Sequence, residues 1–174
     1  MRREALALAA ALLLAGCGGE EPAPEASEPP AVLGAGPVKL PPQVADFPTL
    51  SSKDCAEVVE FYLEALSSHE YPQAALVWDD PVIDAARLEA VFGSYQEAQV
   101  EWTEPFVEGA AGTLYCTISG KLTDARDPAK PLQEGTLLLR RINDVPGATP
   151  DQLRWTLQSS TFVENLARSQ RGEP

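Results

Sequence analysis

The stretch SSKDCAEVVEFYLEALS, residues 51–67, decides the fold of this chain. Its acidic residues Glu57, Glu60 and Glu64 fall on one face at helical spacing, and its apolar residues fall on the opposite face. The hydroxyl and carboxylate groups of residues 51–54 are typical of a helix start. The stretch therefore predicts a helix that ends at about Ser67 and packs through Cys55, Val59, Tyr62, Leu63 and Leu66.

Beyond this helix the sequence predicts two shorter ones. The first begins near Pro72, a residue that suits the first helical turn, and ends at Trp78. The second spans about Asp84 to Phe92, with Asp84 as its cap and Gly93 after its last residue. Three helices are thus expected before any strand.

The second half of the chain changes to the period of β-strands. Residues 98–103, 114–119 and 153–158 alternate apolar and polar side chains, and residues 136–142 form a more continuous apolar run. Turn-rich connections at 109–112, 124–131 and 143–150 separate these segments. Helices followed by antiparallel strands predict an α+β fold.

This order of parts resembles the nuclear transport factor 2-like superfamily, which includes ketosteroid isomerase and polyketide cyclase (SnoaL) relatives. The resemblance lies in the helix with Phe61-Tyr62-Leu63, the short helix ending in Trp78, a third helix and four strands. It implies N-terminal helices packed in a curved antiparallel sheet, in the shape of a cone. The segment from Leu138 to Trp155 also resembles small proteobacterial lipoproteins that carry this domain.

The N-terminus predicts export and lipid attachment. Arg2 and Arg3 precede a short apolar run, and Leu14-Ala15-Gly16-Cys17 resembles a lipobox. We expect a signal peptide at 1–16, lipid on Cys17, a disordered Pro- and Glu-rich tether over 17–47, the folded domain at 48–168 and a disordered tail at 169–174. An ordinary cleaved signal or a short buried helix is the alternative. Gly18 after the cysteine favours, by analogy with sorting rules, the outer membrane facing the periplasm.

The net charge and the cysteine content limit the kinds of partner that the chain can bind. The formal net charge is −13 without any basic stripe, which argues against nucleic-acid binding and leaves membrane attachment to the lipid. Once Cys17 carries lipid, Cys55 and Cys116 remain, either as a disulfide, which the periplasm permits, or as two buried thiols. Their spacing with the single His69 matches no metal site. We expect no metal and no cofactor.

Five aromatic residues are candidates for lining a cavity in the cone, and the alternative is that they fill it: Tyr62, Trp78, Phe92, Trp102 and Trp155. The family resemblance also implies an enzymatic alternative, in which Tyr62 stabilises an oxyanion and Asp79 or Asp80 is the base. The sequence departs from that pattern, because Asp79-Asp80-Pro81 leads into a helix and no second acid is evident on the strands.

The sequence therefore favours a non-catalytic, lipid-anchored envelope protein whose domain binds a small apolar ligand or a partner protein. An isomerase- or cyclase-like enzyme using Tyr62 is the first alternative. A homodimeric structural module is the second. Its interface would be the open sheet face, on which we expect Tyr115, Thr117, Arg141 and Arg154.

Overall fold

The long helix predicted from the sequence is α1, Cys55–Ser67, in a computed structural model that describes residues 40–172. Asp54 caps it by accepting a 2.9 Å hydrogen bond from the Ala56 amide. Two short 3₁₀ turns precede it, η1 (Val44–Asp46) and η2 (Pro48–Ser51). The predicted signal peptide, Cys17 and most of the predicted tether lie outside the described residues.

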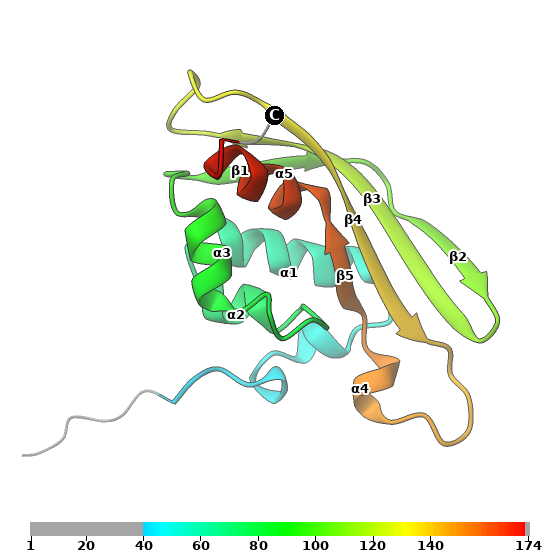
Figure 1. The fold of residues 1–174 in the computed structure, drawn as a ribbon. Coiled ribbons are helices and arrows are strands. Elements are labelled where there is room, and N and C mark those ends of the chain that lie inside the picture. Colours follow the sequence, from blue (N-terminus) through cyan, green and yellow to red (C-terminus); the bar gives the residue numbers. More distant parts are fainter. Residues whose placement is uncertain (1–39, 173–174) are drawn as a thin grey trace, which may run out of the picture. The chain divides into compact units, whose positions relative to one another are not determined.

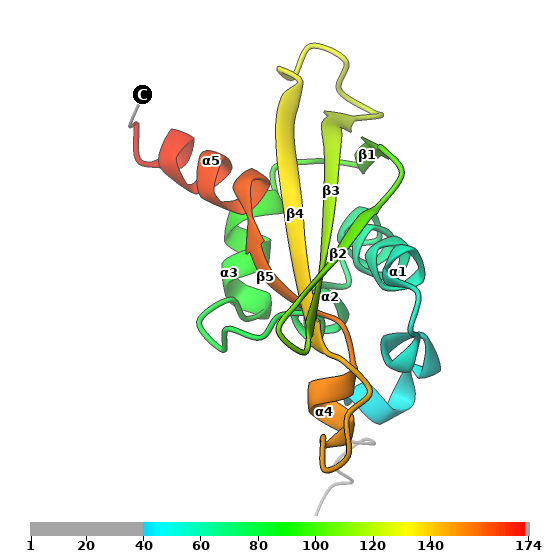
Figure 2. The same cartoon turned by 90° about the vertical axis from the view of Figure 1, so that its right-hand side faces the viewer.

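The third helix lies where the sequence predicts it, whereas the second ends at Ala75 instead of Trp78, because Trp78 forms an isolated β-bridge with Leu157. Helix α2 spans Tyr71–Ala75, and α3 spans Ala85–Phe92. Asp84 accepts a 2.8 Å hydrogen bond from the Arg87 amide at the start of α3, and Gly93 follows its last residue. Figures 1 and 2 show α1, α2 and α3 on one side of the sheet.

The strands form one antiparallel sheet in the described residues: β1 (Ala98–Trp102), β2 (Phe106–Ala110), β3 (Thr113–Asp124), β4 (Gln133–Ile142) and β5 (Thr156–Ser160). Their order is β1-β3-β4-β5. β1 and β2 pair with the two halves of the same edge of β3, because β4 occupies the other edge. Figure 1 shows β3 and β4 curving over the helices. The predicted α+β class is confirmed.

Three further elements differ from the sequence predictions. β2 was not expected, because Gly109 and Ala110 were assigned to a turn that begins only after them. The strand expected at 153–158 starts at Thr156, since Pro150–Leu153 form the short helix α4. A C-terminal helix, α5 (Thr161–Gln170), follows at once, capped by the Ser160 hydroxyl. The sheet thus has five strands instead of the four expected.

The regular elements run from Val44 to Gln170, beyond both ends of the predicted 48–168. Val44 and Phe47 pack against the core, although they fall in the predicted tether. None of the helices within residues 40–172 is long and apolar enough to cross a membrane.

The face of the sheet toward α1, here called the inner face, carries the core. Its side chains on β3 and β4 are buried: Cys116, Ile118, Leu122, Leu137 and Leu139. Cys55 at the start of α1 forms a disulfide with Cys116, with 6.5 Å between the Cα atoms, so this pair is bonded. The bond fixes α1 to the middle of β3.

A buried carboxylate holds the end of β3 to the start of β1. Asp124 accepts hydrogen bonds from the amides of Gln96 (2.8 Å), Glu97 (3.0 Å) and Arg126 (3.1 Å). The Lys130 ammonium lies 3.6 Å away. Burial raises the pKa of Asp124, but the three amides and Lys130 outweigh it, so the pKa lies below its usual value.

Candidate functional site

Four of the five aromatic residues expected around a cavity are packed in the core: Tyr62, Trp78, Phe92 and Trp155. The rings of Tyr62 and Trp78 meet edge to face at 6.4 Å. The Trp155 indole donates a 2.9 Å hydrogen bond to the Lys53 carbonyl. Trp102 is half-buried, packs against the core and lies opposite Gly120 in the register; it is the one member of the set that also lines the large groove described below.

The residues of the enzymatic alternative have very different environments. Tyr62 is 1% exposed, and burial raises the pKa of its hydroxyl far above the ordinary value. Asp79 and Asp80 are exposed. Asp79 accepts a 3.2 Å hydrogen bond from Gln158, and Asp80 accepts one of 2.9 Å from the Val82 amide. Asp79 lines a small hollow with Arg140 and Arg154, of which Tyr62 is not a part.

An open groove of about 760 Å³ lies across β1, β3 and β4 and is here called the outer groove. Two rows of side chains form its walls, and each row runs across the three strands. The charged row is Glu101, Lys121 and Glu134, which are register partners. The hydroxyl row is Thr103, Ser119 and Thr136.

Two paired glycines form the floor of the outer groove. Gly120 lies opposite Gly135 in the register, between the charged and hydroxyl rows. On the inner face no space remains over them. A Cβ at Gly120 would lie 2.8 Å from the Val100 side chain, and one at Gly135 would lie 2.6 Å from the Phe162 ring. Neither Val100 nor Phe162 lines the groove, so the groove lies on the opposite, outer face.

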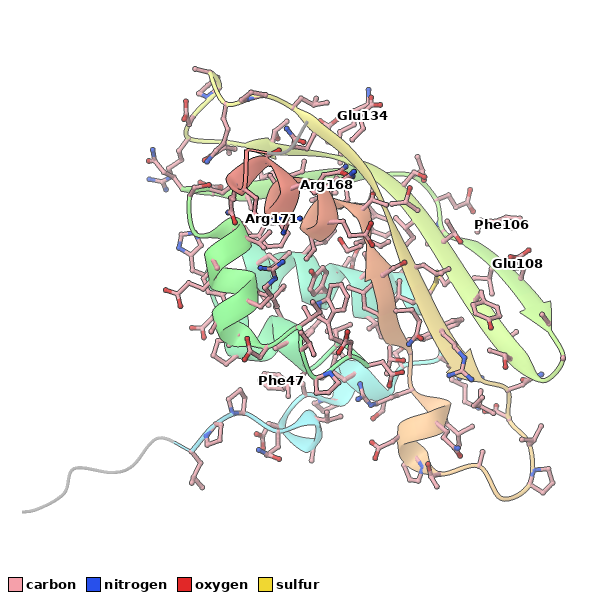
Figure 3. The ribbon with its side chains drawn as sticks, viewed as in Figure 1. Phe47, Phe106, Glu108, Glu134, Arg168 and Arg171 are labelled. Atoms are coloured by element: carbon pink, nitrogen blue, oxygen red, sulfur yellow. A yellow bond between two sulfur atoms is a disulfide. The ribbon has the colours of Figure 1, made fainter. Side chains whose placement is uncertain are left out.

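Side-chain direction agrees with this placement. Successive side chains alternate across a strand, so residues 119 and 121 point away from buried Ile118 and Leu122. Figure 3 shows Glu134 on the side of β4 that faces away from the helices, and Phe106 and Glu108 on the same side of β2. On β3 the outer-face residues Ser119 and Lys121 are exposed, and Tyr115 and Thr117 are half-buried.

The outer groove presents polar groups that have no hydrogen-bond partner within the described residues. Within the described residues, the hydroxyls of Ser119 and Thr136 make no hydrogen bond, whereas Thr103 Oγ1 donates to the Ser119 carbonyl at 3.2 Å. Lys121 Nζ lies 3.8 Å from a Glu134 carboxylate oxygen. At the β4 end, Thr161 and Asn165 of α5 close the groove. Such groups can donate hydrogen bonds to a polar ligand and accept hydrogen bonds from it.

The open sheet face differs from the prediction in two of four residues. Tyr115 and Thr117 lie on the outer face, as expected, since they alternate with buried Cys116. Arg141 was wrongly placed there. It follows the inward alternation of Leu137 and Leu139, is 5% exposed, and donates to the Leu153 carbonyl at 3.2 Å and to Asp144 at 3.3 Å.

Arg154 was also wrongly placed on the open face. It lies between α4 and β5, outside any strand, and its guanidinium donates a 3.1 Å hydrogen bond to the Leu76 carbonyl. The alternation of residues 153–158 predicts a strand that includes Arg154, whereas β5 begins only at Thr156. The guanidinium therefore joins the loop after α2 to the chain before β5.

Sequence reasoning did not find the outer groove. The one signal present was a glycine in each of two strands, which is unusual within a strand and marks a close approach of other groups. No group of three or more metal-ligating side chains in residues 40–172 is placed to hold an ion.

No protein-family model and no curated protein matches the sequence. Three solved structures are similar in fold. The first, from Streptomyces avermitilis, is described as a candidate dehydratase of the nuclear transport factor 2-like family; it is 14% identical, with a TM-score of 0.44, over 65% of this chain and 94% of that one. The second is Bd1075 of Bdellovibrio bacteriovorus, 10% identical, with a TM-score of 0.44, over 62% of this chain and 38% of that one.

The third is a candidate calcium/calmodulin-dependent protein kinase type II association domain from Thiobacillus denitrificans. It is 11% identical, with a TM-score of 0.40, over 60% of this chain and 90% of that one. The family named for the first structure is the one that the sequence resembles. At TM-scores below 0.5 these likenesses carry no inference about activity or ligand.

Proposed function

We propose that this chain is a lipid-anchored, non-catalytic binding protein of the cell envelope and that the outer groove is its binding surface. The observation that carries the proposal is the groove itself, an open hollow of about 760 Å³ with two rows of polar side chains and a floor of paired glycines. That volume lies within the range of ordinary ligand sites.

The same geometry argues for a polar ligand over the apolar one expected from the sequence. Four of the five aromatic side chains expected around an apolar cavity fill the core instead. Apart from Trp102, whose side chain packs against the core, the side chains that line the groove are hydroxyls, carboxylates, one ammonium and one amide. Binding is favoured over catalysis, because Tyr62 is buried apart from the exposed carboxylates of Asp79 and Asp80.

The anchor in this proposal is Cys17. Its support is the sequence Leu14-Ala15-Gly16-Cys17 after an apolar run too short to span a bilayer. One acyl chain holds a protein only marginally, so the proposal requires a multiply acylated cysteine. The acidic chain itself has no attraction to an anionic membrane surface.

The binding role is tested by photo-cross-linking in the envelope. The full chain carries a photoreactive residue at Ser119 or Thr136 in the outer groove, or at Glu60, an exposed position on α1, as the matched control. We expect a discrete adduct from both groove positions and none from Glu60. Equal labelling at all three positions, or none anywhere, contradicts the proposal. A cross-linked dimer would replace it with the homodimer alternative.

The anchor is tested separately by Cys17→Ser. We expect the variant to move from the membrane fraction to the soluble fraction, because the acylated residue is lost. Mass spectrometry of the wild-type chain gives the matching readout, a mature N-terminus at Cys17 that carries acyl mass. Membrane retention of the variant would show that Cys17 is not the anchor and would leave the groove untouched.

A further inference from the structure

The outer groove has the outline of a trough for a linear chain that crosses the strands. It spans β1, β3 and β4 and continues to Thr161 and Asn165 of α5. Neighbouring strands lie about 4.8 Å apart, so the three strands alone give a length of about 10 Å. The two walls are two residues apart along each strand, which is about 6.6 Å. The trough is therefore longer than it is wide.

An extended peptide does not suit this trough. Peptides bind sheets chiefly by adding a strand to an exposed edge, where backbone amides and carbonyls are free. The trough instead crosses β3, whose backbone groups are already paired with β1 on one side and β4 on the other. The outward side chains of the two rows also provide no apolar anchor of the kind that dominates protein interfaces.

The charges of the trough argue against a strongly charged ligand. Glu101 and Glu134 repel anionic polymers, as does the net charge of −13. Polycations gain little, because Lys121 lies 3.8 Å from Glu134 and offsets its charge. A neutral ligand remains.

The hydrogen-bonding groups favour a ligand rich in hydroxyls. Ser119 and Thr136 each offer a hydroxyl that makes no hydrogen bond within the described residues. The Asn165 amide nitrogen is available, since Arg168 contacts only the side-chain oxygen of Asn165. Glu101 adds an acceptor and Lys121 a donor. A ligand hydroxyl can donate a hydrogen bond to one such group and accept a hydrogen bond from another at the same time.

From this geometry we propose that the outer groove binds a short, linear, neutral oligosaccharide that lies across β1, β3 and β4. The inference rests on the proposed function, because it names the ligand class of the same groove. Ser119 and Thr136 bond sugar hydroxyls on one wall, Glu101 and Lys121 bond them on the other, and Asn165 bonds them at the β4 end.

The test is calorimetric titration of the full chain, in a detergent without a sugar headgroup, with cellotetraose, maltotetraose and N-acetylated chitotetraose. We expect at least one of the three to bind with a Kd below about 1 mM, the weak end for a specific contact. Ser119→Ala and Thr136→Ala should each weaken it by about threefold to tenfold, the effect of one lost hydrogen bond. Thr123→Ala, on the outer face of β3 but outside the groove, is the matched control and should leave binding unchanged.

Two results overturn the oligosaccharide assignment: no binding of any of the three probes at 5 mM, about fivefold above the expected limit, or binding that the two groove variants leave unchanged. A third variant, Ser119→Trp, fills the groove from an exposed position and should abolish binding without entering the core. Failure of the oligosaccharide assignment is distinguishable from failure of the proposed binding function. Protein adducts from Ser119 and Thr136 without sugar binding would keep the binding role and replace the ligand, whereas loss of both would remove the groove as a site.

Discussion

The two faces of the sheet have opposite characters, although the same strands form both. On the inner face, Ile118 and Leu139 are at most 1% exposed, and a disulfide joins Cys116 to α1. On the outer face, Ser119 and Lys121 are exposed and line an open groove. Because the side-chain period of a strand is two, one residue of displacement separates a core position from a position in the outer groove. Stability and the proposed binding can therefore be altered separately.

The largest expected effect is on the inner face, in the double variant Cys55→Ala/Cys116→Ala. The disulfide closes a loop over a sequence separation of 61. Its removal should lower the free energy of unfolding by about 4 kcal/mol in the chain-entropy model and the Tm by about 10–20 °C. Thermal unfolding followed by circular dichroism measures this. A loss below about 1 kcal/mol would show that core packing alone holds α1 to β3.

Adjacent leucines of β4 give the sharpest comparison of the two faces. Leu139 is 0% exposed on the inner face, whereas Leu138 is half-buried on the outer face. Leu139→Ala should cost about 3 kcal/mol, and Leu138→Ala about 1 kcal/mol or less. Urea denaturation of both variants measures the difference. Similar costs would mean that another surface covers the outer face in solution.

The smallest expected effect is a pH dependence at the end of β3. The pKa of Asp124 is lowered in the folded state, so the carboxylate stabilises the fold above its unfolded pKa of about 3.9. That contribution is lost as the pH falls through the lower folded-state pKa. Wild-type Tm should fall between about pH 5 and about pH 3 more steeply than that of Asp124→Asn. Parallel curves would assign acid sensitivity to other carboxylates.

Helices α1 and α3 were predictable because their signals are local. Asp54 and Asp84 cap α1 and α3 through their own neighbouring amides, and Gly93 follows α3. The α+β fold class was predictable because the apolar pattern changes from the period of a helix to the period of a strand in the second half of the chain. α5 was missed because it starts directly at the end of β5, where Ser160 is both the last strand residue and the helix cap. No Gly or Pro marks that boundary.

The candidate site was not predictable, because it depends on register. Glu101, Lys121 and Glu134 are far apart in the sequence and meet only through the pairing of β1, β3 and β4. The inward direction of Arg141 follows from the alternation of side chains along β4, which puts Arg141 on the same face as the buried residues Leu137 and Leu139. Whether the expected cone cavity exists depends on whether Tyr62 and Trp155 leave space in the core. That is a property of side-chain packing, which the sequence does not give.

The Cys55–Cys116 bond also has a mechanical consequence. It closes a covalent loop of the chain that contains α1, α2, α3, β1 and β2. When the chain is pulled from its two ends, tension passes from Cys55 directly into β3, and residues 56–115 add no length while the bond is intact. All extension must come from segments outside the loop, β4 among them. The outer groove spans this boundary, with Thr103 inside the loop and Thr136 outside it, so stretching the domain takes the groove apart while most of the helical layer stays tethered.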